Sequence, residues 1–116
     1  MTTIYHNPRC SKSRETLALL AERGVEPEVV LYLDAPPDAA TLETLLAQLG
    51  FDDPRQLMRT KEAEYAELGL DDPQLGRAAL LAAMAAHPRL IERPIVVKDG
   101  RAVLGRPPEN VLGLFD

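Results

Sequence analysis

The order in which strand-forming and helix-forming segments alternate over the first 50 residues most limits the folds open to this chain. Residues 2–5 favour a strand, which ends at the letters HNP because proline interrupts a strand and asparagine favours a turn. From residue 11 to about 23, leucine and alanine recur at helical spacing before Gly24 stops the helix. The apolar letters VVLYL within residues 28–33 predict a second strand, buried and parallel to the first.

A second helix is predicted directly after this strand. Asp38 can cap it, and Gly50 ends it after four leucines that share one face. Those leucines are Leu42, Leu45, Leu46 and Leu49. The resulting order of strand, helix, strand and helix implies a right-handed crossover between two parallel strands.

The second half of the chain predicts short turns, one longer helix and a hairpin. Residues 53–75 are polar and interrupted by glycine and proline, which favours short helical turns. The alanine-rich residues 77–86 predict a helix, and the letters IVVKDGRAVLG predict a hairpin that turns at DG. The paired prolines at 107–108 begin a last short helix.

This order of elements predicts an α/β fold of the thioredoxin-like type. We expect a mixed four-stranded sheet flanked by helices, with a helical insertion between the second and third strands. A length of 116 residues suits a single domain over residues 1–116. Hydrophobic residues make up 46% and charged residues 27%, a balance typical of a folded globule.

Charge and hydropathy argue against several classes of function. The net charge of -5 repels nucleic acid and acidic membrane surfaces, so a bound anion needs a local basic cluster. The longest uncharged apolar stretch, residues 78–86, is shorter than the ~20 residues that span a bilayer. The first residues lack the pattern of an export signal. We therefore expect a cytoplasmic protein without nucleic-acid or membrane partners. We also expect it to be a monomer.

The single cysteine, Cys10, lies between the first predicted strand and the first helix. Unpaired backbone N–H groups and the helix dipole favour a thiolate at such a position. Positive charge nearby would lower the thiol pKa further, and it comes from His6, Arg9, Lys12 and Arg14. The same helix start, at Ser11, Lys12 and Ser13, could bind a tetrahedral oxyanion. The competing interpretation is a small buried apolar cysteine, which these basic neighbours disfavour.

Four ordered segments of the chain resemble the ArsC family of glutaredoxin-linked arsenate reductases. The letters HNPRCSKSRETL from His6 are similar to the active-site loop of that family. Later segments also resemble it: MRTKEAEY from Met58, ERPIVV from Glu92 and GRPPENVL from Gly105. Within this loop, the letters CSKSR are similar to those of the short YfgD-like branch of the family.

The resemblance implies a thioredoxin-like fold in which the Cys10 thiolate attacks arsenate. Three arginines would hold the oxyanion, namely Arg59, Arg93 and Arg106. Guanidinium groups suit this role because they match tetrahedral oxyanions, stay charged and stabilise charge in the transition state. The resemblance also implies that His6 keeps Cys10 ionised. Because thioredoxin-like folds usually place a cis-proline facing the cysteine, we expect a cis Arg93–Pro94 bond.

Ser13 stands where a CxxC redox protein carries its second thiol. Its hydroxyl can donate a hydrogen bond to the Cys10 thiolate but cannot form a disulfide. A product on Cys10 would then need an outside thiol, so the resemblance implies glutathione as co-substrate and glutaredoxin as partner. We expect no bound cofactor, and no metal site because one cysteine and two distant histidines lack zinc spacing.

Two other functions stay open. The same thiol could serve a glutathione-dependent oxidoreductase that acts on protein mixed disulfides or on another oxyanion. The fold could instead form a partner-binding module without catalysis, as in the related Spx proteins. Those proteins usually carry a CxxC, where this chain reads CSKS.

Overall fold

The computed structural model describes residues 1–115, which divide into two compact units. Unit 1 consists of Met1–Ala35 and the chain from Arg93 onward, and it contains the whole sheet. Unit 2, Pro36–Glu92, is the helical insertion between the second and third strands. The single domain expected over residues 1–116 stays a prediction.

The sheet of unit 1 is mixed and has the strand order β2-β1-β3-β4. Its strands are β1 (Thr2–His6), β2 (Glu28–Leu31), β3 (Ile95–Lys98) and β4 (Arg101–Leu104). β1 is parallel to β2 and antiparallel to β3, and β3 and β4 form the predicted hairpin. Asp99 (φ 51°) and Gly100 (φ 82°) make its turn, with the positive φ at both positions that a tight two-residue hairpin requires. The predicted α/β fold with a mixed four-stranded sheet is confirmed.

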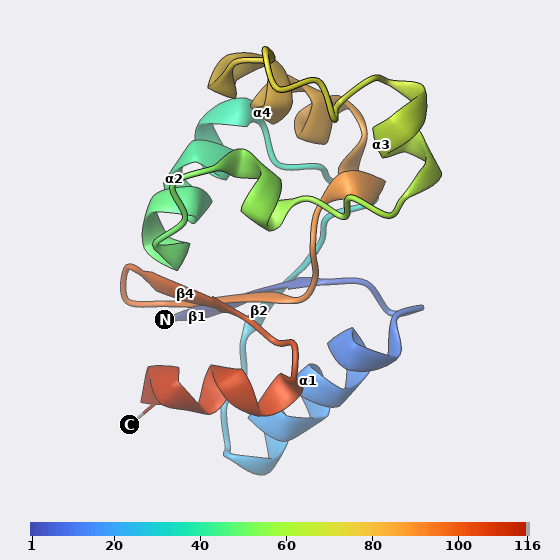
Figure 1. The fold of residues 1–116 in the computed structure, drawn as a ribbon. Helices are drawn as coiled ribbons and strands as arrows, with labels where there is room; N and C mark the ends of the chain where they lie inside the picture. The colour runs from blue at the N-terminus through green and yellow to red at the C-terminus, as the bar shows by residue number, and fades with distance from the viewer. Residues whose placement is uncertain (116) are drawn as a thin grey trace. The chain divides into compact units, whose positions relative to one another are not determined.

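Two helices cover one face of this sheet, namely α1 (Ser11–Glu22) and the 3-10 helix η3 (Pro108–Phe115) (Figure 1). Their apolar side chains meet those of the central strands in one buried cluster, formed by Ile4, Leu20, Val96, Val111 and Leu114. Burial of each such side chain contributes roughly 1.5–3 kcal/mol. Because alternate residues of a strand share a face, His6 lies on the same side of β1 as Ile4, toward α1.

The prediction for β2 was wrong in its extent and its burial. The strand ends at Leu31 rather than Leu33, and it lies at the edge of the sheet with β1 as its strand neighbour. Val29 is 44% and Leu31 41% exposed. A run of β-branched and aromatic residues indicates a strand, but it does not report how many neighbours that strand will have.

Unit 2 follows the predicted order of helices and short turns. It contains α2 (Ala39–Leu49), η1 (Pro54–Leu57), α3 (Ala63–Glu67), α4 (Arg77–Ala86) and η2 (Pro88–Leu90). The Asp38 side chain accepts a hydrogen bond of 2.8 Å from the Thr41 N–H, and Gly50 ends α2 with φ 74°, as expected. Arg77 of α4 pairs with Glu43 of α2 at 2.6 Å. No helix within residues 1–115 is both long and apolar enough to cross a membrane.

Candidate active site

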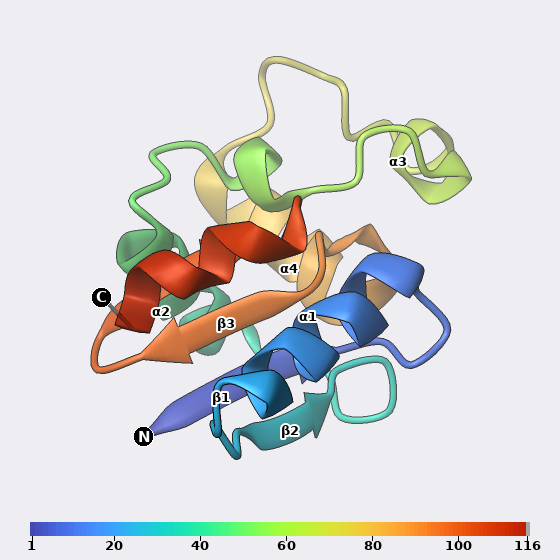
Figure 2. The ribbon, with the colours of Figure 1, turned by 90° about the horizontal axis from the view of Figure 1, so that it is seen from below.

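Cys10 caps the N-terminus of α1 with an extended backbone (φ -96°, ψ 123°). Its N–H donates to the Asn7 carbonyl at 3.0 Å, and its carbonyl accepts from the Arg14 N–H at 3.0 Å. The loop is also held by Arg14, whose guanidinium donates to the Pro8 carbonyl at 2.9 Å. Figure 2 shows this loop at the end of β1, leading into α1. Cys10 is partly exposed, which suits a residue that meets a substrate from solvent.

Several groups act on the ionisation of Cys10. Partial burial is the largest influence and raises the pKa of the thiol. Opposing it are hydrogen bonding from the Ser13 N–H, the charge of Arg93, the Lys12 N–H and a hydrogen bond from the Arg93 side chain. Together they hold the pKa of Cys10 below its usual value. The helix start therefore favours the thiolate, as predicted, but the charge that lowers the pKa of Cys10 is that of Arg93 rather than of the predicted neighbours His6, Arg9, Lys12 and Arg14.

His6 reaches this loop through Ser13. The His6 side chain is 6% exposed, and its Nδ1 lies 2.6 Å from the Oγ of the fully buried Ser13. The same oxygen accepts from the Asn7 N–H at 3.0 Å. Burial, followed by the charge of Arg14, lowers the pKa of His6, which favours the neutral imidazole. His6 thus holds the residue whose N–H stabilises the thiolate; a direct ion pair with Cys10 stays a prediction.

Arg93 and Arg106 lie at the two ends of the β3–β4 hairpin, as predicted. An Arg106 guanidinium nitrogen donates to the Arg93 carbonyl at 3.3 Å. The expected cis Arg93–Pro94 bond is present, and Arg106–Pro107 is also cis. Arg93 Nε is buried, and no hydrogen-bond acceptor for it lies among residues 1–115. A buried guanidinium N–H without an acceptor, on the arginine that acts on the thiolate, suits an anionic substrate.

Thr16 and Gly105 complete the packing that brings these arginines to α1, and sequence reasoning missed both. Thr16 is fully buried, and its hydroxyl donates to the Lys12 carbonyl at 2.8 Å. A Cβ on Gly105 would lie 2.5 Å from Thr16 Oγ1 and 2.8 Å from Pro94 Cγ. The Gly105 N–H also donates to the Pro94 carbonyl at 3.0 Å. The glycine directly after β4 was the available signal, because such a glycine often marks a close backbone approach.

The remaining predicted site residues lie at different places. Ser11 and Lys12 are exposed in the first turn of α1, and Lys12 Nζ lies 3.8 Å from a Glu15 oxygen. Arg59 belongs to unit 2, where it pairs with Glu62 at 3.1 Å. Its predicted role in binding the oxyanion stays a prediction. Within residues 1–115, no group of three or more His, Cys, Asp or Glu side chains converges as metal ligands do.

Comparisons with known proteins agree with this reading of the chain. YfgD of Escherichia coli K12, an uncharacterized protein, is 64% identical over 109 residues, which cover 94% of this chain and 92% of YfgD. An arsenate reductase of Neisseria meningitidis serogroup A is 56% identical over 93% of this chain and 92% of its own length. The solved arsenate reductase of Vibrio cholerae superimposes with a TM-score of 0.95 at 57% identity, over 97% of this chain and 95% of that one.

These likenesses confirm the predicted thioredoxin-like fold and the resemblance to YfgD. The model of the ArsC family matches residues 5–114, a range that begins within β1 and ends within η3. That match includes Cys10 and the arginines at both ends of the hairpin. The chain therefore belongs to the ArsC family.

Proposed function

We propose that this chain is an arsenate reductase that uses the Cys10 thiolate as its nucleophile. The observation that carries the proposal is the partly exposed Cys10, whose thiol has a pKa lowered by the start of α1 and by Arg93. Relatives of more than 50% identity that are named arsenate reductases support the choice of substrate. Glutathione and glutaredoxin are the proposed reductants, since the chain has no second cysteine.

The substrate would bind as an oxyanion at the start of α1. Backbone N–H groups of the first turn, at Ser11, Lys12 and Ser13, offer donors and a favourable dipole. Arg93 offers the buried Nε–H that lacks an acceptor within the described chain. Arg106, tied to the Arg93 carbonyl, adds a second positive charge on the same hairpin. These donors would stabilise the transition state by binding the arsenate oxygens on which negative charge builds.

The proposed reaction begins at sulfur and conserves atoms and electrons. The Cys10 thiolate bonds to arsenic(V), and one arsenate oxygen leaves as water. The glutathione thiol then displaces a second oxygen, also as water. A glutaredoxin thiolate attacks the glutathionyl sulfur, a disulfide forms, and the electron pair of the sulfur–arsenic bond reduces arsenic to the trivalent state. Water finally releases arsenite and returns the Cys10 thiol.

A coupled assay tests the proposal. Arsenate-dependent NADPH consumption is followed with glutathione, glutaredoxin and glutathione reductase present, for wild type and Cys10→Ser. We expect a rate in wild type and none above background in the variant. Arg23→Gln, a charge change at the opposite end of α1, is the matched control and should keep the wild-type rate. A wild-type rate no higher than that of Cys10→Ser would refute the proposal.

The second candidate is a glutathione-linked oxidoreductase acting on protein mixed disulfides. The same lowered thiol pKa favours it, because thiol–disulfide exchange needs a thiolate. It predicts Cys10-dependent release of glutathione from a glutathionylated protein in an assay without arsenate. A stoichiometric protein complex that forms equally well with Cys10→Ser would instead favour the partner-binding alternative.

A further inference from the structure

A groove of about 280 Å³ lies in unit 1 directly beside the cysteine loop. Residues 6–9 form one side, and Leu31, Leu33 and Asp34 form the other. Figure 2 shows the segment after β2 close to the loop between β1 and α1. The groove is near the lower end of the ~300–1,000 Å³ that small-molecule sites usually occupy.

We propose that this groove binds the glutathione that reacts at Cys10. Arg9 would take a carboxylate of the tripeptide and Asp34 its ammonium group. The inference rests on the proposed function, because that function requires an outside thiol to reach the cysteine. It adds the place where this thiol binds and the residues that recognise it.

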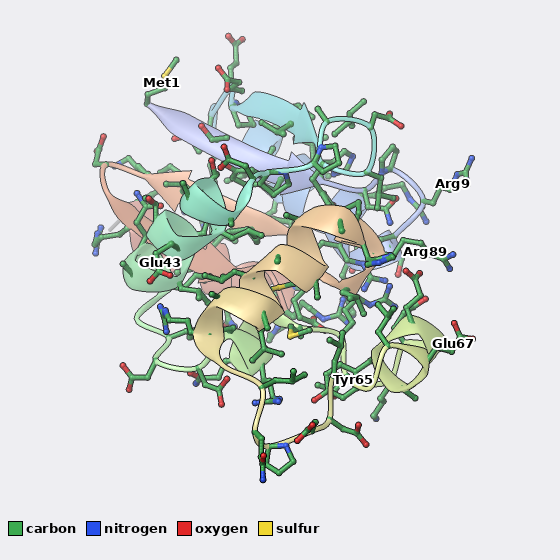
Figure 3. The ribbon with its side chains drawn as sticks, turned by 90° about the horizontal axis from the view of Figure 1, so that it is seen from above. Met1, Arg9, Glu43, Tyr65, Glu67 and Arg89 are labelled. Carbon is green, nitrogen blue, oxygen red and sulfur yellow. The ribbon has the colours of Figure 1, made fainter. Side chains whose placement is uncertain are left out.

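The charges of the groove match those of glutathione. At neutral pH the tripeptide carries carboxylates at its two ends and an ammonium group at one of them. Arg9 and Asp34 are both exposed, and neither forms an ion pair with any other residue of the described chain. Figure 3 shows the Arg9 side chain extending away from the ribbon into solvent. One unpaired cation and one unpaired anion therefore line the same groove.

The apolar wall of the groove suits the middle of the tripeptide. Leu31 is 41% and Leu33 36% exposed, and both line this groove. Contact with the methylene groups of the ligand would remove part of this apolar surface from water. Leu31, the last residue of the edge strand β2, and Leu33, just after it, supply this wall.

Cys10 is the next residue in the chain after residues 6–9, which line one side of the groove. Cys10 directly follows Arg9, and its N–H is bound to the Asn7 carbonyl at 3.0 Å. This hydrogen bond keeps the cysteine against the loop that forms the groove. A peptide held at both ends here would have its own sulfur, which is near its middle, close to Cys10.

A second groove of unit 1 is larger, about 430 Å³, but its lining is negatively charged. Its walls include Glu15, Glu22 and Glu109, and the one lysine among them, Lys12, lies 3.8 Å from Glu15. Such a surface repels a ligand with two carboxylates. It provides a matched control for the proposal.

The test compares two disulfides as reagents for Cys10. In each reaction the thiolate attacks one sulfur, a mixed disulfide forms, and the other half leaves as a thiolate. Glutathione disulfide carries the charges of the ligand, whereas 2-hydroxyethyl disulfide is neutral. The ratio of the two rate constants, measured by intact-mass spectrometry, therefore reports recognition of glutathione and cancels any change in the reactivity of Cys10.

We expect Arg9→Ala and Asp34→Asn each to lower this ratio by about two- to fivefold, the range for exposed ion pairs. Glu22→Gln, which changes a charge in the other groove, should leave the ratio unchanged. An unchanged ratio in either groove variant overturns the assignment, since it requires both charges. Circular dichroism of the variants verifies that they are folded.

Binding of S-methylglutathione, which cannot react, provides a second measurement. Its addition should shift the amide NMR signals of residues 6–9 and 31–34 and spare those around Glu22. Shifts confined to other residues would overturn the proposal. Because neither experiment contains arsenate, loss of the groove and loss of the proposed reductase activity are distinguishable.

Discussion

At the scale of the residue, the site depends on which groups meet the Cys10 sulfur. The Ser13 N–H and the Arg93 side chain both favour the thiolate against the effect of burial. His6 acts on Ser13 through a hydrogen bond of 2.6 Å and so helps to hold the loop. Ionisation of the thiol and stability of the loop should therefore respond to different substitutions.

Arg93→Gln should raise the pKa of Cys10. Arg93 lowers this pKa by its charge and by a hydrogen bond, and glutamine retains only a neutral donor. At neutral pH a smaller fraction of the thiol is then ionised, and alkylation by iodoacetamide slows. Thiolate absorbance near 240 nm, followed against pH, measures the shift; Arg23→Gln provides the charge-matched control. A titration curve equal to that of wild type would contradict the assignment of Arg93.

The pKa of His6 predicts a dependence of stability on pH. Burial lowers this pKa in the folded chain, so between that value and the ordinary ~6.5 the unfolded chain binds more protons. The contribution of His6 to the free energy of unfolding is therefore complete above about pH 6.5. It is lost as the pH falls through the folded pKa.

Urea denaturation of wild type and His6→Asn from pH 7.5 to 5 measures this contribution. Over this pH range the unfolding free energy of the variant should decrease less than that of wild type. Equal pH dependence in wild type and His6→Asn would refute the role given to burial.

At the scale of the element, the end of the hairpin meets α1 at a close backbone approach. Gly105 lies against Thr16 of α1 and against Pro94, the residue after Arg93. The position of Arg93 beside the cysteine loop therefore depends on the absence of a side chain at residue 105.

Gly105→Ala should destabilise the chain by about 1–3 kcal/mol, as overpacking of a tight contact does. The new Cβ would lie 2.5 Å from Thr16 Oγ1 and 3.1 Å from its Cγ2. Adding Thr16→Ala should recover part of the loss, since it removes both atoms. Gly113→Ala is the matched control, because its Cβ meets no atom within 4 Å. Thermal unfolding measures all four proteins, and equal midpoints for the two single glycine variants would contradict this packing.

Many of the helices and turns could be predicted from the local sequence. Periodicity and capping residues located α1, α2 and α4, and the letters DG located the hairpin turn, because these signals depend on near neighbours. The exposure of β2, the contact of Thr16 with Gly105 and the bond of His6 to Ser13 depend on segments brought together by folding. No local pattern contains those partners.

At the scale of the whole molecule, the candidate residues divide between the two units. Cys10, Arg93 and Arg106 belong to unit 1, and the contacts described for them all lie within it. Arg59 belongs to unit 2, and its assignment to the oxyanion comes from the resemblance of the letters MRTKEAEY alone. A measurement of activity, rather than the local geometry, can test this assignment.

Arg59→Ala should raise the KM for arsenate by roughly tenfold or more, because a hydrogen bond to a charged group contributes about 1.5–3 kcal/mol. Arg89→Ala is the matched control, since Arg59 and Arg89 pair with the same carboxylate, that of Glu62, at 3.1 and 3.2 Å. Both variants lose one ion pair to Glu62, so a simple loss of stability would appear in both. Steady-state rates against arsenate concentration, with unfolding midpoints for each protein, separate the two effects. Equal KM values in the two variants would remove Arg59 from the site and leave Arg93 and Arg106 as its arginines.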